Sequence, residues 1–107
     1  MKTIKLSEIA HARSGDKGNH ANVGVVSLSD EGFEHLKQCL TEEAVANYFE
    51  PLGPSRVERF ELHGIRGLNF LLHDVLAGGA SQSLRVDSQG KTLGLAILEM
   101  EIPAMAG

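Results

Sequence analysis

Alternation of apolar and polar residues predicts two strands near the start of the chain. Residues 3–12 alternate in the manner of a half-buried strand, and residues 23–28 form a short run rich in β-branched side chains. The residues between them, 13–22, are polar and punctuated by Gly15 and Gly18, which is typical of a loop. We therefore expect the two strands to pair antiparallel around this loop.

The next part of the chain, residues 29–54, has the pattern of helices. Ser29 and Asp30 are good N-cap residues, and apolar residues then recur at helical spacing over 33–40. A second cap at 41–43 precedes another apolar helical run over 44–49. The pattern predicts two consecutive helices or one bent helix, which ends at Pro51, Gly53 and Pro54.

The second half of the chain is predicted to alternate strands and helices. Residues 57–62 alternate as a strand, whereas Leu68, Leu71, Leu72, Val75 and Leu76 have the i, i+3, i+4, i+7, i+8 spacing of a core-facing helix. A short strand is expected over 83–87 and a helix over 92–100, where helical spacing is favoured over a strand. The tail, 103–107, is expected to be frayed.

The predicted order is β-β-α-β-α-β-α, with no repeat and no linker. A mixed or antiparallel sheet with helices on one face would bury every apolar stripe, so the expected fold is an α+β two-layer sandwich. At 107 residues the chain has room for a single domain, 1–107. Such a sheet leaves a face or an edge that another chain can cover.

Composition narrows the class of protein. Fourteen Asp and Glu against ten Lys and Arg give a net charge of −4, and there is no tryptophan, so a nucleic-acid partner is not expected. No run of residues has the length and apolarity of a signal or membrane segment, so no membrane partner is expected and the predicted location is cytoplasmic. The single cysteine, Cys39, excludes an intrachain disulfide and a cysteine-based zinc cluster. We expect it to pack inertly in a helix, with a reactive thiol as the alternative.

Two clusters could hold an anion. Glycine lets backbone N–H groups turn toward an anion, and Arg or Lys neutralises its charge. The alternative is that both clusters are ordinary turns whose glycines satisfy backbone geometry, with Arg85 paired to an aspartate. The candidate residues are Arg13, Ser14, Gly15, Asp16, Lys17, Gly18 and Asn22 in the first cluster, and Gly78, Gly79 and Arg85 in the second.

The sequence gives only weak indications of a nucleotide-binding loop, a metal site or acid–base catalysis. Gly90-Lys91-Thr92 lacks the earlier glycine of a phosphate-binding P-loop, because Arg85 stands there. No histidine pair has zincin spacing, so no metal site is predicted, although His11, His20 and Asp16 could share a metal if the fold brought them together. His11 and His20 are also candidate acid–base groups near the loop.

The run from His11 to Val25, HARSGDKGNHANVGV, resembles the signature of AtuA-like proteins, the acyclic terpene utilisation family. Leu68-Asn69-Phe70, Gly78-Gly79 and Ser83-Leu84-Arg85 are also similar to the small domain of that family, and the resemblance extends to about Met100. His20 departs from the acidic or hydroxyl residue expected after Asn19, which argues against a catalytic role at that position.

The resemblance implies a ferredoxin-like α+β fold and kinship with the region that follows the large AtuA domain in longer proteins. It further implies a separately encoded small subunit or accessory domain that docks on a large AtuA-like chain. The catabolic enzyme would be of hydratase or lyase type, acting on branched or terpenoid acids or their acyl-CoA thioesters. An acyl-CoA or carboxylate ligand is expected, and no cofactor.

Two other hypotheses stay open. The chain could be a non-catalytic assembly or binding module that forms a homo-oligomer, with its polar loops held together by hydrogen bonds. An independent small enzyme is the third hypothesis, and it is disfavoured because the sequence shows no complete set of acid, base and nucleophile.

Overall fold

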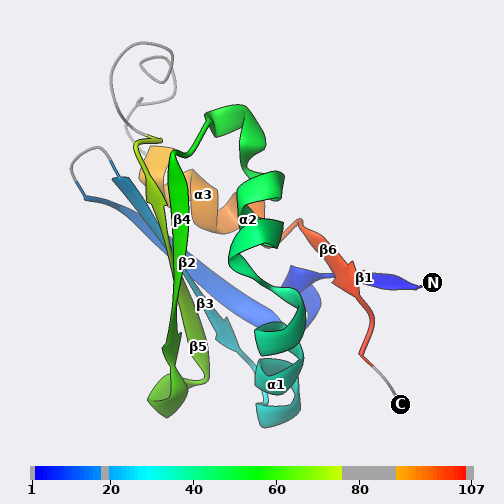
Figure 1. Cartoon of the computed structure of the whole chain (residues 1–107). Helices are drawn as coiled ribbons and strands as arrows, with labels where there is room; N and C mark the ends of the chain where they lie inside the picture. Colours follow the sequence, from blue (N-terminus) through cyan, green and yellow to red (C-terminus); the bar gives the residue numbers. More distant parts are fainter. Residues whose placement is uncertain (1, 18–19, 76–88, 106–107) are drawn as a thin grey trace.

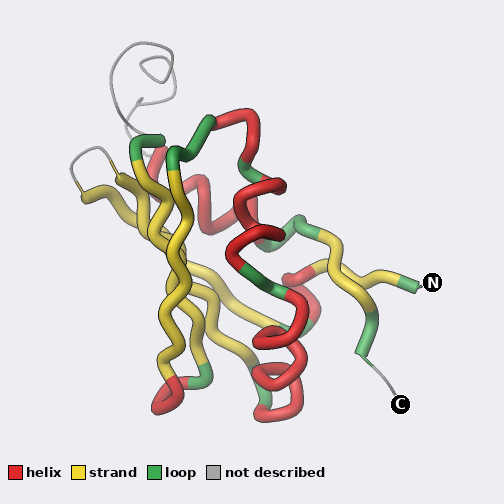
Figure 2. Tube along the Cα trace, viewed as in Figure 1, coloured by secondary structure: helices red, strands yellow, loops and turns green. Residues whose placement is uncertain are grey.

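A four-stranded antiparallel sheet carries helices on one of its faces (Figure 1). The computed structural model describes residues 2–17, 20–75 and 89–105. Figure 2 shows the strands of this sheet on one side, with helices beside them. The α+β fold with helices on one face, expected from the sequence, is confirmed. The described elements are β1 (Thr3–Lys5), η1 (Leu6–Glu8), β2 (Ala10–Lys17), β3 (His20–Ser27), α1 (Asp30–Cys39), α2 (Glu42–Tyr48), η2 (Glu50–Leu52), β4 (Arg56–Leu62), η3 (His63–Ile65), β5 (Gly67–His73), α3 (Gln89–Ile97) and β6 (Glu101–Pro103).

The sheet has the order β2-β3-β5-β4, so β3 and β5 are its central strands. The chain leaves β3 through α1 and α2, enters at the edge as β4, and then inserts β5 between β4 and β3. β1 and β6 form a separate two-stranded ribbon near the two termini, on the far side of the helices from the sheet (Figure 1).

Alternate residues of the strands face the helices and form the core. Val23 and Val25 of β3 and Phe70 and Leu72 of β5 are fully buried there. Apolar residues of the helices cover them, among them Phe33, Leu36, Val45, Leu93 and Ile97. The opposite face of the sheet carries no helix among the described residues (Figure 1). We call it the open face.

The predicted first two helices are confirmed, and their start signals act as expected. Ser29 Oγ accepts a hydrogen bond from Gly32 N at 3.0 Å, and Thr41 Oγ1 accepts one from Ala44 N at 3.0 Å. At the other end of α1, Arg59 Nη1 donates to the carbonyl oxygens of Lys37 and Leu40, at 3.0 and 3.1 Å. A charged donor thus satisfies carbonyls that a helix end leaves without partners.

The predicted helix over 68–76 is wrong, because residues 67–73 form the central strand β5. Leu68, Phe70 and Leu72 face the core, while Asn69 and Leu71 face the open side. The segment matches helical spacing because Leu71, which faces the open side, is apolar. Together with Leu68 and Leu72 it forms an i, i+3, i+4 pattern that a strand with two apolar faces also produces. Hydrogen bonds to β3 and β4 on both sides decide in favour of the strand.

The ends of the chain also differ from the prediction. The expected single strand over 3–12 is two strands, β1 and β2, because η1 turns the fully buried Leu6 into the core. The last helix, α3, spans Gln89–Ile97 and is followed by β6. Pro103, expected in a frayed tail, pairs with Thr3, and its carbonyl oxygen lies 2.6 Å from His35 Nε2. The predicted strand over 83–87 lies outside the described residues.

Candidate functional site

The polar segment 13–22 is a strand hairpin, so the predicted loop is wrong for most of its length. Arg13 to Lys17 belong to β2 and pair with Gly24 to His20 of β3. Polar residues are tolerated in these strands because no helix of the described residues lies on the open face. Small residues such as Ala12 and Ala21 are sufficient on the helix side.

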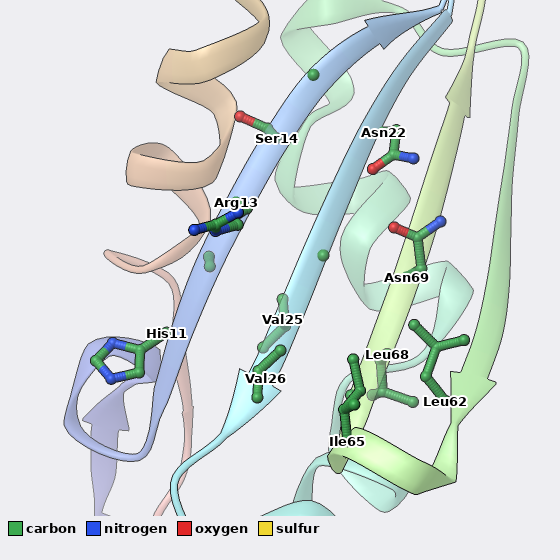
Figure 3. Close-up of a pocket in the computed structure, with 14 residues that line it drawn as sticks. His11, Arg13, Ser14, Asn22, Val25, Val26, Leu62, Ile65, Leu68 and Asn69 are labelled. Carbon is green, nitrogen blue, oxygen red and sulfur yellow. The ribbon is translucent and has the colours of Figure 1, made fainter.

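The pairing sorts the candidate residues by face. Arg13 and Gly15 alternate with Ser14 along β2, so they project from the open face, as does Asn22, which pairs with Gly15. Ser14 points the other way, and its Oγ accepts a hydrogen bond from Gly94 N of α3 at 2.8 Å (Figure 3). Its side chain therefore joins β2 to α3, and it does not reach a ligand on the open face.

The remaining candidate residues stay a prediction. Asp16 and Lys17 pair with Ala21 and His20 as the end of β2, and their side chains lie outside the description. Gly18, Gly78, Gly79 and Arg85 lie outside the described residues, so the second predicted anion cluster is not tested.

A groove of about 520 Å³ runs over the open face (Figure 3). This size is typical of a small-molecule site. We call it the open-face groove. It is lined by His11, Ala12, Arg13, Ser14, Gly15, Asn22, Gly24, Val25, Val26, Leu62, Ile65, Gly67, Leu68 and Asn69.

The open-face groove is polar in its middle and apolar at one end. One row across the sheet pairs Arg13 with Gly24 and Gly24 with Asn69, so a guanidinium and an amide flank a glycine. Asn22 stands beside Asn69 from the neighbouring strand (Figure 3). Toward η3 the lining turns apolar, with Leu62 42% and Ile65 56% exposed. The arrangement suits a ligand with an anionic or polar head and an apolar tail.

Sequence reasoning missed Asn69, Leu62 and Ile65 as site residues. Asn69 lies in the segment predicted as a helix and Leu62 in the predicted strand 57–62, and the sequence suggests no role for either of them or for Ile65. The signal that could have found Asn69 is its position as the polar residue between Leu68 and Phe70, since such alternation marks a strand with one exposed face.

A second polar cluster lies at the hairpin end of the same face. The rings of His20 and His73 are edge to face, with centroids 4.8 Å apart, and His73 Nε2 donates to Glu58 Oε1 at 2.7 Å. This hydrogen bond is the main reason that the pKa of Glu58 is lowered from its ordinary value. Asp74 N donates to His20 Nδ1 at 3.0 Å, which places the proton of a neutral His20 ring on Nε2.

The predicted acid–base pair His11 and His20 is not brought together. His11 pairs with Val26, which is six residues from His20 along β3, or about 20 Å at the rise of a strand. Among the residues that the structure describes, no three His, Cys, Asp or Glu side chains form a group that could hold a metal ion. The conditional metal site of His11, His20 and Asp16 is therefore not supported.

Cys39 lies half-buried near the end of α1, against the core. Burial raises the pKa of its thiol, so less of it is thiolate at neutral pH. Both observations favour the interpretation of Cys39 as a packing residue.

The sheet, the single helical layer and the open face together define an α+β two-layer domain of the ferredoxin-like kind. The sequence comparison agrees, since residues 4–103 match the model of the AtuA ferredoxin-like domain. The chain belongs to this family. No curated protein and no solved structure matches it. Within the described ranges, none of the helices is long and apolar enough to cross a membrane.

Proposed function

We propose that the chain is the small subunit or accessory domain of an AtuA-like catabolic enzyme and docks on a large AtuA-like chain in the cytoplasm. The family match supports this, because the matched unit is a domain of AtuA proteins. The enzyme acts on branched or terpenoid acids or their acyl-CoA thioesters in a hydratase or lyase reaction. In this proposal the chain contributes part of the ligand site and is not an independent catalyst.

The open face is the docking surface in this proposal. Phe60 and Leu62 of β4 and Ile65 of η3 are 46%, 42% and 56% exposed, and the register of β4 places the first two on the open face. Clustered apolar side chains of this size mark interaction sites when they stand at a surface. The large chain would cover the open-face groove and enclose a ligand that the shallow groove alone leaves exposed.

In this proposal the residues that contact the ligand lie on the open face. The guanidinium of Arg13 offers a charge and two donors to a carboxylate or phosphate, and Asn22 adds an amide. Gly15 leaves space beside Arg13, because nothing lies within 4 Å of the position its Cβ would take.

Co-expression with a large AtuA-like chain encoded in the same source tests the docking. Size-exclusion chromatography with light scattering should show a complex of the two chains, which Phe60→Ser with Leu62→Lys abolishes. Leu95→Lys is the matched control, because Leu95 is 69% exposed on α3, on the helix side of the sheet. Absence of a complex for the wild-type chain would rule out the subunit function.

The alternative function is a non-catalytic assembly module. The same apolar residues favour it, since a second copy of the chain could cover the open face equally. In the same experiment this alternative predicts a homo-oligomer that persists when the large chain is present, and that the Phe60 and Leu62 substitutions dissociate.

A further inference from the structure

Gly24 stands at the centre of the open face, where the fold itself does not require a glycine. Its neighbours across the sheet are Arg13 on β2 and Asn69 on β5. A Cβ at this position would meet only Asn69 Oδ1 at 3.6 Å and the Arg13 carbonyl oxygen at 3.9 Å, which are ordinary contacts. Its φ lies outside the left-handed range that favours glycine. Because glycine weakens a strand interior, its presence here needs another reason.

At two other glycines, Gly94 and Gly67, close packing within the chain leaves little room for a side chain. A Cβ on Gly94 would come within 3.2 Å of backbone atoms of Arg13 and Ser14, and one on Gly67 within 3.3 Å of the Ile65 side chain. These positions are crowded by the chain itself. The space above Gly24 is instead part of the open-face groove, which indicates that something outside the chain approaches the backbone there.

The groups around Gly24 define what could approach. The row Arg13–Gly24–Asn69 places a guanidinium on one side of the glycine and an amide on the other. The next row toward η3 joins Val26 through Gly67 to Leu62, about 7 Å away at the rise of a strand. An anionic head over Gly24 therefore has apolar side chains within reach of a short tail.

We propose that Gly24 is the floor of a binding site for a monocarboxylate with a short apolar tail. The carboxylate lies between Arg13 and Asn69, and the tail packs against Val26, Leu62 and Ile65. Arg13 is the only lysine or arginine among the residues that line the described groove, and one positive charge matches a monoanion better than a phosphate dianion. The site rests on the proposed function, because the large chain is what would close it, and it selects the free acid over the acyl-CoA thioester.

Calorimetry with 3-methylbutanoate as the probe tests the site on the 107-residue chain and on its complex with the large chain. We expect binding of the probe, and acetate should bind at least tenfold more weakly, because each buried methylene contributes about a factor of four. Gly24→Val should reduce affinity at least tenfold while the protein stays as stable or becomes more stable, since valine favours a strand. Arg13→Gln should weaken binding similarly, and Arg56→Gln, a 65% exposed arginine outside the groove, should not.

Three results would overturn the site. Unchanged affinity of Gly24→Val would show that the floor is not used. Equal or tighter binding of inorganic phosphate or of the 3-methylbutanoyl-CoA thioester would refute the carboxylate head. No binding of any probe, by the chain or by the complex, would refute the site altogether. The subunit function fails separately, through absence of the complex, so the two failures are distinguishable.

Discussion

Gly32 is the position where two opposing effects of one methyl group can be separated by experiment. It is the third residue of α1, and its N–H is the donor to the N-cap Ser29. Alanine in a helix is favoured over glycine by about 1 kcal/mol. A Cβ at this position would, however, lie well inside van der Waals contact of Ser27 Oγ and 3.1 Å from Ser29 Oγ.

The cost depends on what Ser27 loses when it moves. Ser27 is 2% exposed, and its Oγ donates to Ser29 O at 2.8 Å and accepts from Ser29 N at 3.2 Å. Each such hydrogen bond contributes about 0.5–1.5 kcal/mol, so losing both costs about 1–3 kcal/mol. After the helix gain is subtracted, Gly32→Ala should destabilise the protein by about 1 kcal/mol.

The clash is with a side chain, so removing that side chain should reverse the sign. In a Ser27→Ala background, which itself costs about 1–2 kcal/mol, Gly32→Ala should be neutral or slightly stabilising. Urea denaturation of the four proteins of this cycle, followed by circular dichroism, gives the interaction energy, expected at about 1–2 kcal/mol. An equal cost of Gly32→Ala in both backgrounds would show that Ser27 is not the obstacle.

Three further outcomes are expected. Gly94→Ala should destabilise the protein by about 1–3 kcal/mol in urea denaturation, and Ser14→Ala should not rescue it, because the methyl group would meet the β2 backbone. Arg59→Met keeps the aliphatic stem but removes the donors to the last carbonyls of α1, and the urea midpoint should report a loss of about 1–3 kcal/mol. The lowered pKa of Glu58 contributes stability that is present above its unfolded value near 4.5 and is lost as pH falls through the folded pKa. Glu58→Gln should therefore reduce the loss of unfolding free energy between neutral pH and about pH 3, which lies below the unfolded value of 4.5. If the loss of stability in acid is unchanged in this variant, the hydrogen bond between Glu58 and His73 is not its cause.

The helical layer could be predicted well because its signals are local. Ser29 and Thr41 precede apolar runs at helical spacing, and both act as N-caps through their own side chains. A cap and the first turn of its helix are adjacent in sequence, so their chemistry is readable without knowledge of the fold. The same holds for Gly53, which takes the left-handed conformation, φ 65°, after η2.

The central strand could not be predicted because its conformation is decided by its neighbours. Leu68, Leu71 and Leu72 fit one face of a helix as well as they fit a strand with a partly apolar open face. Phe70, fully buried, was not part of the predicted helical stripe. Hydrogen bonds to β4 on one side and to β3, which is distant in sequence, on the other select the strand, and the local pattern does not contain the pairing with β3.

The wrong loop prediction and the proposed binding site have the same origin. Gly15, Asn22 and Gly24 lower the strand signal of β2 and β3, because strands are normally enriched in β-branched and aromatic residues. A face that only meets water could carry threonine, lysine or valine at these positions, and a central glycine costs the strand about 0.5–1 kcal/mol relative to alanine. The protein has a glycine at position 24 despite this loss of stability, although the fold has room for a side chain there. The glycine and asparagine residues that lead to the wrong loop prediction are therefore the same residues that leave space on the open face. Their presence is better explained by a ligand or a partner than by contact with solvent alone.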